Sequence, residues 1–157
     1  MRLIPNAKIT TDETTKIRLG AVVEYEQHGV PHLAVIVGEK RDKWGLQNQA
    51  GGNLELAGDR LYLIPGLKLD TGFSADQRSK ALTEILTSAE KIAAEVSMEE
   101  LWETFREAQS EVSASEMAEL AFGKDVGCEH LAMRRLLLTD QIYFKRKKTN
   151  FEPRPVE

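Results

Sequence analysis

The stretch RRLLLTDQIYFKRKKTNFEPRP, residues 134–155, decides how the second half of this 157-residue chain folds. Three consecutive leucines close a helical segment, and Asp140-Gln141 has the composition of a turn. Residues 142–147 then have the composition of a strand, residues 148–150 form a second turn, and Phe151 lies on a short return strand. The sequence therefore predicts a basic β-hairpin that directly follows a helix.

Upstream of this hairpin, apolar residues recur with the 3.6-residue period of helices. Ser74 with Gln77, and Ser97 with Glu100, have the spacing of capping boxes, and Gly123 suits a helix terminus. The expected helices cover residues 75–96, a segment from 97, residues 116–122 and residues 126–138. Three helices closed by a β-hairpin form a winged-helix arrangement, which we predict for residues 97–157.

The first half of the chain has a different pattern, in which short runs of β-branched and aromatic residues alternate with glycine turns. Because strands this short cannot leave one face of a sheet bare, we expect them to curl into a small SH3-like β-barrel over residues 18–68. The expected strands are 20–26, 31–38, 43–48, 53–56 and 61–64. The whole chain is thus predicted to be α+β, with an arm at 1–17, the barrel, a connecting helix at 74–96 and the winged-helix domain.

Composition and charge narrow the class of protein. The longest apolar run, Leu33 to Val37, is far shorter than the roughly 20 residues that a membrane helix needs, so we expect a cytoplasmic protein without a membrane partner. Cys128 is the single cysteine, which excludes an internal disulfide and fits a reducing compartment. The net charge of −4 is unevenly distributed, with 0 on residues 1–73, −6 on residues 74–139 and +2 on residues 140–157.

No residue set in the sequence has the order or spacing of a catalytic centre. His28 and His32 are four apart, but glycine and proline lie between them, so exposed turn histidines are expected rather than a metal site. The acidic stripe Glu99, Glu103 and Glu107 is expected to be a solvated helix face, because a straight stripe spreads its carboxylates instead of converging them on an ion. We therefore expect no catalytic residue, metal or cofactor in this chain by itself.

Nucleic-acid binding is the chemistry that the hairpin favours. Lys145, Arg146, Lys147 and Lys148 can meet phosphates, and Tyr143 beside them can stack on a base. The alternative is that the aromatic residues pack beneath the helices and the lysines only keep an edge strand from aggregating.

Two residues outside the hairpin are weaker candidates. Arg134 is the basic residue that the third helix of the domain could present, but Leu136 to Leu138 occupy much of its circumference, which argues against major-groove reading. Trp44 could stack on a single-stranded base, although a core or rim tryptophan is the more common role in a small barrel.

Several of these segments together resemble a known family. They are Gly20-Ala-Val-Val-Glu-Tyr25, Leu101-Trp102 with Phe105, residues 135–147, and Phe151-Glu-Pro-Arg-Pro155. The chain, from about Gly20 onward, resembles the N-terminal region of ribonuclease II family 3′–5′ exoribonucleases, in the subgroup of photosynthetic and related bacteria and plastids. The stretch from Tyr143 to Pro155 is the most specific part of the resemblance.

The resemblance implies a role in RNA degradation or processing. The family degrades RNA processively from the 3′ end with a magnesium-dependent, aspartate-rich catalytic domain that follows this region, so the chain is expected to be a fragment of a longer nuclease, ending at Glu157. Its own role would be to guide single-stranded RNA, with the catalytic nuclease domain as partner. Two alternatives stay open: a protein-interaction or docking module, favoured by the acidic segment 74–139, and a DNA-binding winged-helix regulator.

Overall fold

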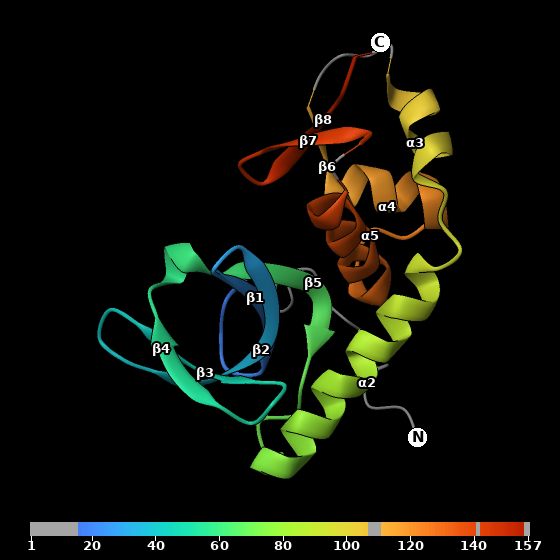
Figure 1. Cartoon of the computed structure of the whole chain (residues 1–157). Helices are drawn as coiled ribbons and strands as arrows, with labels where there is room; N and C mark the ends of the chain where they lie inside the picture. The colour runs from blue at the N-terminus through green and yellow to red at the C-terminus, as the bar shows by residue number, and fades with distance from the viewer. Residues whose placement is uncertain (1–15, 107–110, 141, 156–157) are drawn as a thin grey trace. The chain divides into compact units, whose positions relative to one another are not determined.

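The computed structural model describes residues 16–106, 111–140 and 142–155, and its fold is α+β (Figure 1). The chain divides into two compact units, one up to Ser88 and one from Ala89. The boundary lies inside helix α2 (Ala75–Ala93), the segment predicted as a connecting helix. Within the described ranges, no helix is long and apolar enough to cross a bilayer.

The first unit contains a five-stranded antiparallel sheet in the order β4-β3-β2-β1-β5. Figure 1 shows these strands curving around a common interior. Their bounds are β1 (Ala21–Gln27), β2 (Val30–Glu39), β3 (Trp44–Asn48), β4 (Asn53–Leu56) and β5 (Tyr62–Lys68), with the short 3-10 helix η1 (Gly58–Arg60) between β4 and β5. The five predicted strands are present, and their assignment to the SH3-like class stays a prediction.

Strand β5 runs four residues beyond its predicted end at Ile64. A β-bulge explains the difference, because Val23 pairs with Leu63 whereas Ala21 pairs with Lys68, so extra residues of β5 are accommodated between two nearby pairs. Gly66 lies there with a φ of 88°, a backbone conformation that glycine adopts without strain. The Pro65-Gly66 pair thus bends the strand instead of ending it.

A buried core holds this sheet together, and one buried side chain of the sheet bonds to the start of α2. Its buried members are Ala21, Val23, Tyr25, Ala34, Ile36 and Leu46. Gln47 of β3 is 1% exposed and donates from Nε2 to the Ala75 carbonyl (2.8 Å) and to Ser79 Oγ (3.0 Å). Its own carbonyl oxygen accepts from Arg78 Nε, so a single buried amide fixes the first turns of α2 on the sheet.

The second unit contains the predicted helices and hairpin. The helices are α3 (Met98–Phe105), α4 (Ala114–Phe122) and α5 (Gly127–Thr139), and the strands are β6 (Val112–Ser113), β7 (Phe144–Lys147) and β8 (Asn150–Pro153). The strands form a sheet in the order β6-β8-β7, so β7 is an edge strand. The two-residue strand β6 was not predicted, because two residues are too few to show alternation.

Local capping sets the helix limits. Ser74 and Gln77 form the predicted capping box, with reciprocal bonds of 2.8 and 3.2 Å, and Ser97 Oγ accepts from the amide of Glu100. A further capping box between Ser113 and Glu116 starts α4 two residues before the predicted start. Helix α2 ends at Ala93 rather than at residue 96, and Gly123 ends α4 with a φ of 74° as expected.

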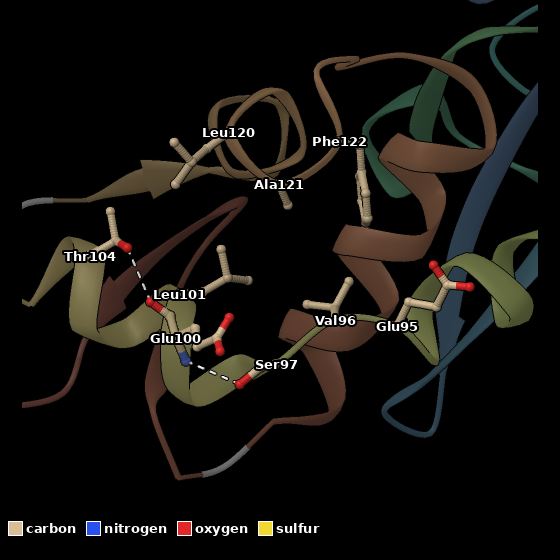
Figure 2. Close-up of a pocket in the computed structure, with 9 residues that line it drawn as sticks. All are labelled: Glu95, Val96, Ser97, Glu100, Leu101, Thr104, Leu120, Ala121 and Phe122. Carbon is tan, nitrogen blue, oxygen red and sulfur yellow. Dashed lines mark hydrogen bonds between the residues drawn. The ribbon is translucent and has the colours of Figure 1, made fainter.

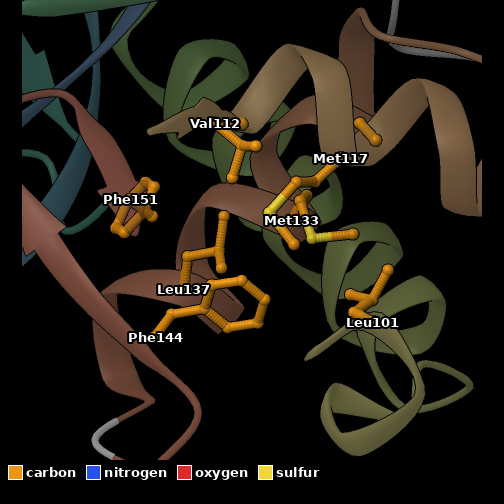
Figure 3. Close-up of a cluster of buried hydrophobic side chains, with 9 residues drawn as sticks. Leu101, Val112, Met117, Met133, Leu137, Phe144 and Phe151 are labelled. Atoms are coloured by element: carbon orange, nitrogen blue, oxygen red, sulfur yellow. The ribbon is translucent and has the colours of Figure 1, made fainter. Parts of the chain in front are cut away.

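The core of the second unit joins the helices to the hairpin (Figure 3). Phe144 of β7 and Phe151 of β8 are 1% and 2% exposed and lie with Leu137 and Met133 of α5 in one cluster. Leu101, Val112, Ala114, Met117 and Ala118 complete the buried set. One side of the hairpin is therefore part of the domain core, and this fixes the side that remains accessible.

Candidate nucleic-acid interface

The hairpin β7–β8, called the wing below (residues 144–153), is fixed at its base by one carboxylate. Asp140 Oδ2 accepts from the backbone amides of Tyr143 (3.0 Å) and Phe144 (2.8 Å). A charged acceptor satisfies two amides just before the first wing strand, which is a strong arrangement for a chain reversal. The strand therefore begins at Phe144, two residues later than predicted, and Ile142 lies outside it with 72% of its surface exposed.

The basic residues of the wing are accessible. Lys145, Arg146 and Lys148 are exposed, and Lys147 is half-buried. Lys147 and Asn150 pair across the hairpin, so its loop is Lys148-Thr149, shorter than the predicted three-residue turn. Lys148 has a φ of 59°, and its carbonyl accepts from Arg146 Nε at 2.9 Å, which holds the tip in one conformation.

A single acidic residue of the wing offsets part of this charge. Glu152 pairs directly with Lys145 across the strands, and its Oε1 lies 3.8 Å from Lys147 Nζ. The two side chains of that ion pair are 35% and 38% exposed, so the pair is worth at most about 1 kcal/mol. With four cations and one carboxylate, residues 144–153 keep a net charge of +3.

An aromatic and cationic cluster at the base of the wing was not predicted. The ring of Tyr143 lies 5.9 Å from that of Trp102 at 47°, and the guanidinium of Arg106 lies 5.2 Å from the centre of the Trp102 ring. Glu103 Oε1 is 3.5 Å from Arg106 Nε. The i, i+4 spacing of Trp102 and Arg106 was a visible signal, whereas the proximity of α3 to Tyr143 required the fold.

The two aromatic residues at the start of the wing, Tyr143 and Phe144, differ in how accessible they are. Phe144 is buried in the core, as in the alternative in which the aromatics pack beneath the helices. Tyr143 is half-buried against Trp102. A base could reach its exposed part only, so the cations, and not an aromatic platform, are the main accessible groups of the wing.

The two candidates outside the wing lie in less accessible positions. Arg134 is 5% exposed on α5, a helix that also buries Cys128, His130, Leu131, Ala132, Met133 and Leu137. A helix buried to this extent lacks the polar face that major-groove reading needs, and the burial of Arg134 opposes a direct phosphate contact. Trp44 begins β3, is half-buried and packs against the core of the first sheet, which is the rim role weighed above.

The two histidines considered as metal ligands lie in different settings in the first sheet. His28 is exposed in the β1–β2 turn with a φ of 55°, as expected. His32 was expected to be an exposed turn residue, but it is half-buried within β2, in the segment predicted as the strand 31–38, and its ring stacks on Tyr25 with centroids 5.2 Å apart. In the part of the chain that the structure describes, no three His, Cys, Asp or Glu side chains gather around a possible ion. Glu107 of the acidic stripe lies outside the described residues.

Two buried titratable groups of α5 have shifted pKa values. Burial, with a smaller contribution from the charge of Glu129, raises the pKa of Cys128 to about 11. A thiol with this pKa is protonated at neutral pH and is a poor nucleophile. Burial also lowers the pKa of His130, whose Nδ1 lies 3.0 Å from the Asp125 carbonyl and 3.3 Å from Ser115 Oγ.

Comparison with known proteins finds a similarity over the part of the chain that contains the second unit. Residues 84–157 match the family described as "Ribonuclease II, winged helix domain". An uncharacterized ribonuclease of the cyanobacterium Synechocystis sp. is 29% identical over 139 residues, which is 87% of this chain. The chain spans 20% of the length of that relative. No solved structure matches the chain significantly. Residues 84–157 are therefore similar to the winged-helix domain of ribonuclease II, and most of the chain is similar to about a fifth of the length of a longer ribonuclease.

Proposed function

We propose that this chain is the non-catalytic, substrate-guiding part of a ribonuclease II family 3′–5′ exoribonuclease, and that its wing contacts the phosphates of single-stranded RNA. The observation that carries the proposal is the wing itself, in which a buried Phe144–Phe151 core holds three exposed cations in fixed positions. The family match and the ribonuclease relative support RNA as the ligand.

The geometry favours backbone contacts over base recognition. The ammonium groups of Lys145 and Lys148 and the guanidinium group of Arg146 can donate hydrogen bonds to phosphate oxygens. Tyr143 exposes only part of its ring to a base. Such an interface binds RNA weakly, with little sequence preference and a strong dependence on salt. Weak binding without sequence preference is what a guide needs, because a processive nuclease must let the strand slide.

The parent protein would supply the chemistry. We propose that a magnesium-dependent catalytic nuclease domain hydrolyses the RNA in the cytoplasm and that this chain, with its SH3-like sheet and its winged helix, helps to guide the strand to that domain. The second alternative, DNA binding, has less support because α5 lacks an exposed polar face.

Fluorescence anisotropy with a labelled oligouridine of about 12 nucleotides tests the wing. The variant Lys145→Gln/Arg146→Gln/Lys148→Gln is expected to weaken binding at low salt about tenfold or more. If all three cations meet phosphates, the slope of log K against log salt should fall by about 2, since each contact on a single strand contributes about 0.7.

A control with the same change in net charge separates a local from a global effect. Lys80, Lys91 and Lys124 are exposed outside the wing, and changing these three to Gln should alter the affinity less than threefold or so. Equal losses in the two triple variants, or no loss in the wing variant, would contradict the proposal.

A further inference from the structure

A groove that the RNA hypothesis does not use lies between α3, α4 and the turn after α2 (Figure 2). Its volume is about 310 Å³. It is lined by Glu95, Val96, Ser97, Glu100, Leu101, Thr104, Leu120, Ala121 and Phe122. In Figure 2, Val96, Leu101 and Phe122 point toward the same space, and Leu120 lies at its edge.

The apolar part of the groove is partly open to solvent. Leu120 is 53% exposed, and Val96 and Phe122 are half-buried, while Leu101 at 6% exposure forms a floor. An exposed leucine beside other apolar side chains in a concave site is the pattern of an anchor site for a partner side chain.

The polar part of the groove is acidic. Ser97 Oγ and Thr104 Oγ1 already bond to the backbone of Glu100. Among the described residues, the carboxylates of Glu95 and Glu100 form no ion pair. Helices α3 and α4 carry five glutamates and no lysine or arginine along their lengths, so the potential around the groove is negative.

We infer that this groove binds a basic amphipathic α-helix of a protein partner, with leucine-like side chains against Leu120, Leu101 and Phe122 and with lysine or arginine near Glu95 and Glu100. Charge complementarity selects this occupant. Phosphates would be repelled by the carboxylates of Glu95 and Glu100 that line the groove, whereas the apolar stripe of a helix fits a groove that lies between two helices. The winged-helix unit would then present a basic wing to RNA and an acidic groove to protein.

The experiment uses the 157-residue chain and a designed, fluorescein-labelled peptide of about 16 residues. The peptide has leucines at i, i+3, i+4 and i+7 and lysines elsewhere, so its leucines share one helical face. A control peptide has the same composition in an order that scatters the leucines. Fluorescence polarisation should give a Kd below about 100 μM for the amphipathic peptide and binding at least about fivefold weaker for the scattered one.

Two groove variants are compared with matched controls. Leu120→Ser, and separately Glu95→Gln/Glu100→Gln, should each weaken peptide binding about fivefold or more. The controls are Leu19→Ser, at a leucine 45% exposed in the other unit, and Glu99→Gln/Glu119→Gln, at glutamates of α3 and α4 that do not line the groove. Both controls should change the Kd less than about twofold.

Three results would overturn the inference: equal binding of the two peptides, equal effects of the groove and control variants, or loss of oligouridine binding in Leu120→Ser, which would assign the groove to RNA. Circular dichroism confirms that each variant is folded. If Leu120→Ser is not, Leu120→Gln takes its place at this exposed position.

Discussion

The indole Nε1 of Trp102 donates a hydrogen bond to the backbone carbonyl of Arg154, 2.7 Å away and 52 residues further along the chain. The amide of Arg154 in turn donates to the Tyr143 carbonyl at 2.8 Å. The segment that follows the wing is thus held from both sides, by helix α3 and by the residue that precedes the wing. These bonds connect the helical core to the proposed RNA-binding hairpin.

Replacing Trp102 by Phe should lower the free energy of unfolding by about 2 kcal/mol, because the half-buried Arg154 carbonyl loses its donor and packing is lost as well. Urea denaturation followed by circular dichroism measures the change. Arg154→Met is the matched control and should be nearly neutral, since the backbone of Arg154 makes these contacts and its buried side-chain Nε has no hydrogen-bond partner among the described residues. A larger loss in Arg154→Met than in Trp102→Phe would contradict this account.

Asp140→Ala should loosen the base of the wing without removing a cation. The amides of Tyr143 and Phe144 lose their shared acceptor, so their hydrogen exchange should accelerate about tenfold or more, a change that corresponds to about 1.4 kcal/mol. Exchange measured by NMR reports this directly. Asp140→Asn keeps one side-chain oxygen and should retain much of the protection, and the same protection in Asp140→Ala as in the wild type would show that the carboxylate is dispensable.

Gly20→Ala should destabilise the first unit by about 2 kcal/mol or more. Gly20 has a φ of 89°, and a Cβ there would lie 2.6 Å from the Leu69 carbonyl oxygen. Both positions are set by the backbone, so only a backbone shift could relieve this clash. Thermal unfolding gives the comparison with Gly38→Ala, where a Cβ would meet nothing within 4 Å. We expect little change from that control, and similar melting temperatures for the two variants would refute the steric argument.

His130 should make stability depend on pH. Because burial holds its pKa below 6.5 in the folded state, the unfolded chain binds more protons in acid. The contribution of neutral His130 to the free energy of unfolding is therefore fully present above about pH 6.5. It decreases as the pH falls below that value, by at most about 1.4 kcal/mol per pH unit for one proton. Urea denaturation at pH values from 7.5 to 5 gives the free energy of unfolding as a function of pH. This free energy should depend less on pH in His130→Asn than in the wild type or in His28→Gln. An unchanged pH dependence in His130→Asn would exclude His130 as the cause.

The sequence by itself determined the elements and the order in which they occur. Periodicity located the helices and most strands, and the capping residues Ser74, Ser97 and Gly123 marked helix ends, because these signals depend on neighbours within about four residues. The stretch from Leu136 to Lys148 indicated the wing for the same reason. The family resemblance, carried by local motifs, was confirmed for the winged-helix domain.

Tertiary structure decided which side chains remain accessible. Arg134 and Lys145 are both basic in the sequence, yet one is 5% exposed on α5 and the other is exposed on an edge strand. The contacts of Trp102 with Tyr143 and Arg154, and the groove beside Leu120, likewise join segments distant in the chain. Burial and long-range hydrogen bonding depend on which surfaces meet after folding, and local sequence patterns do not determine which distant segments come into contact.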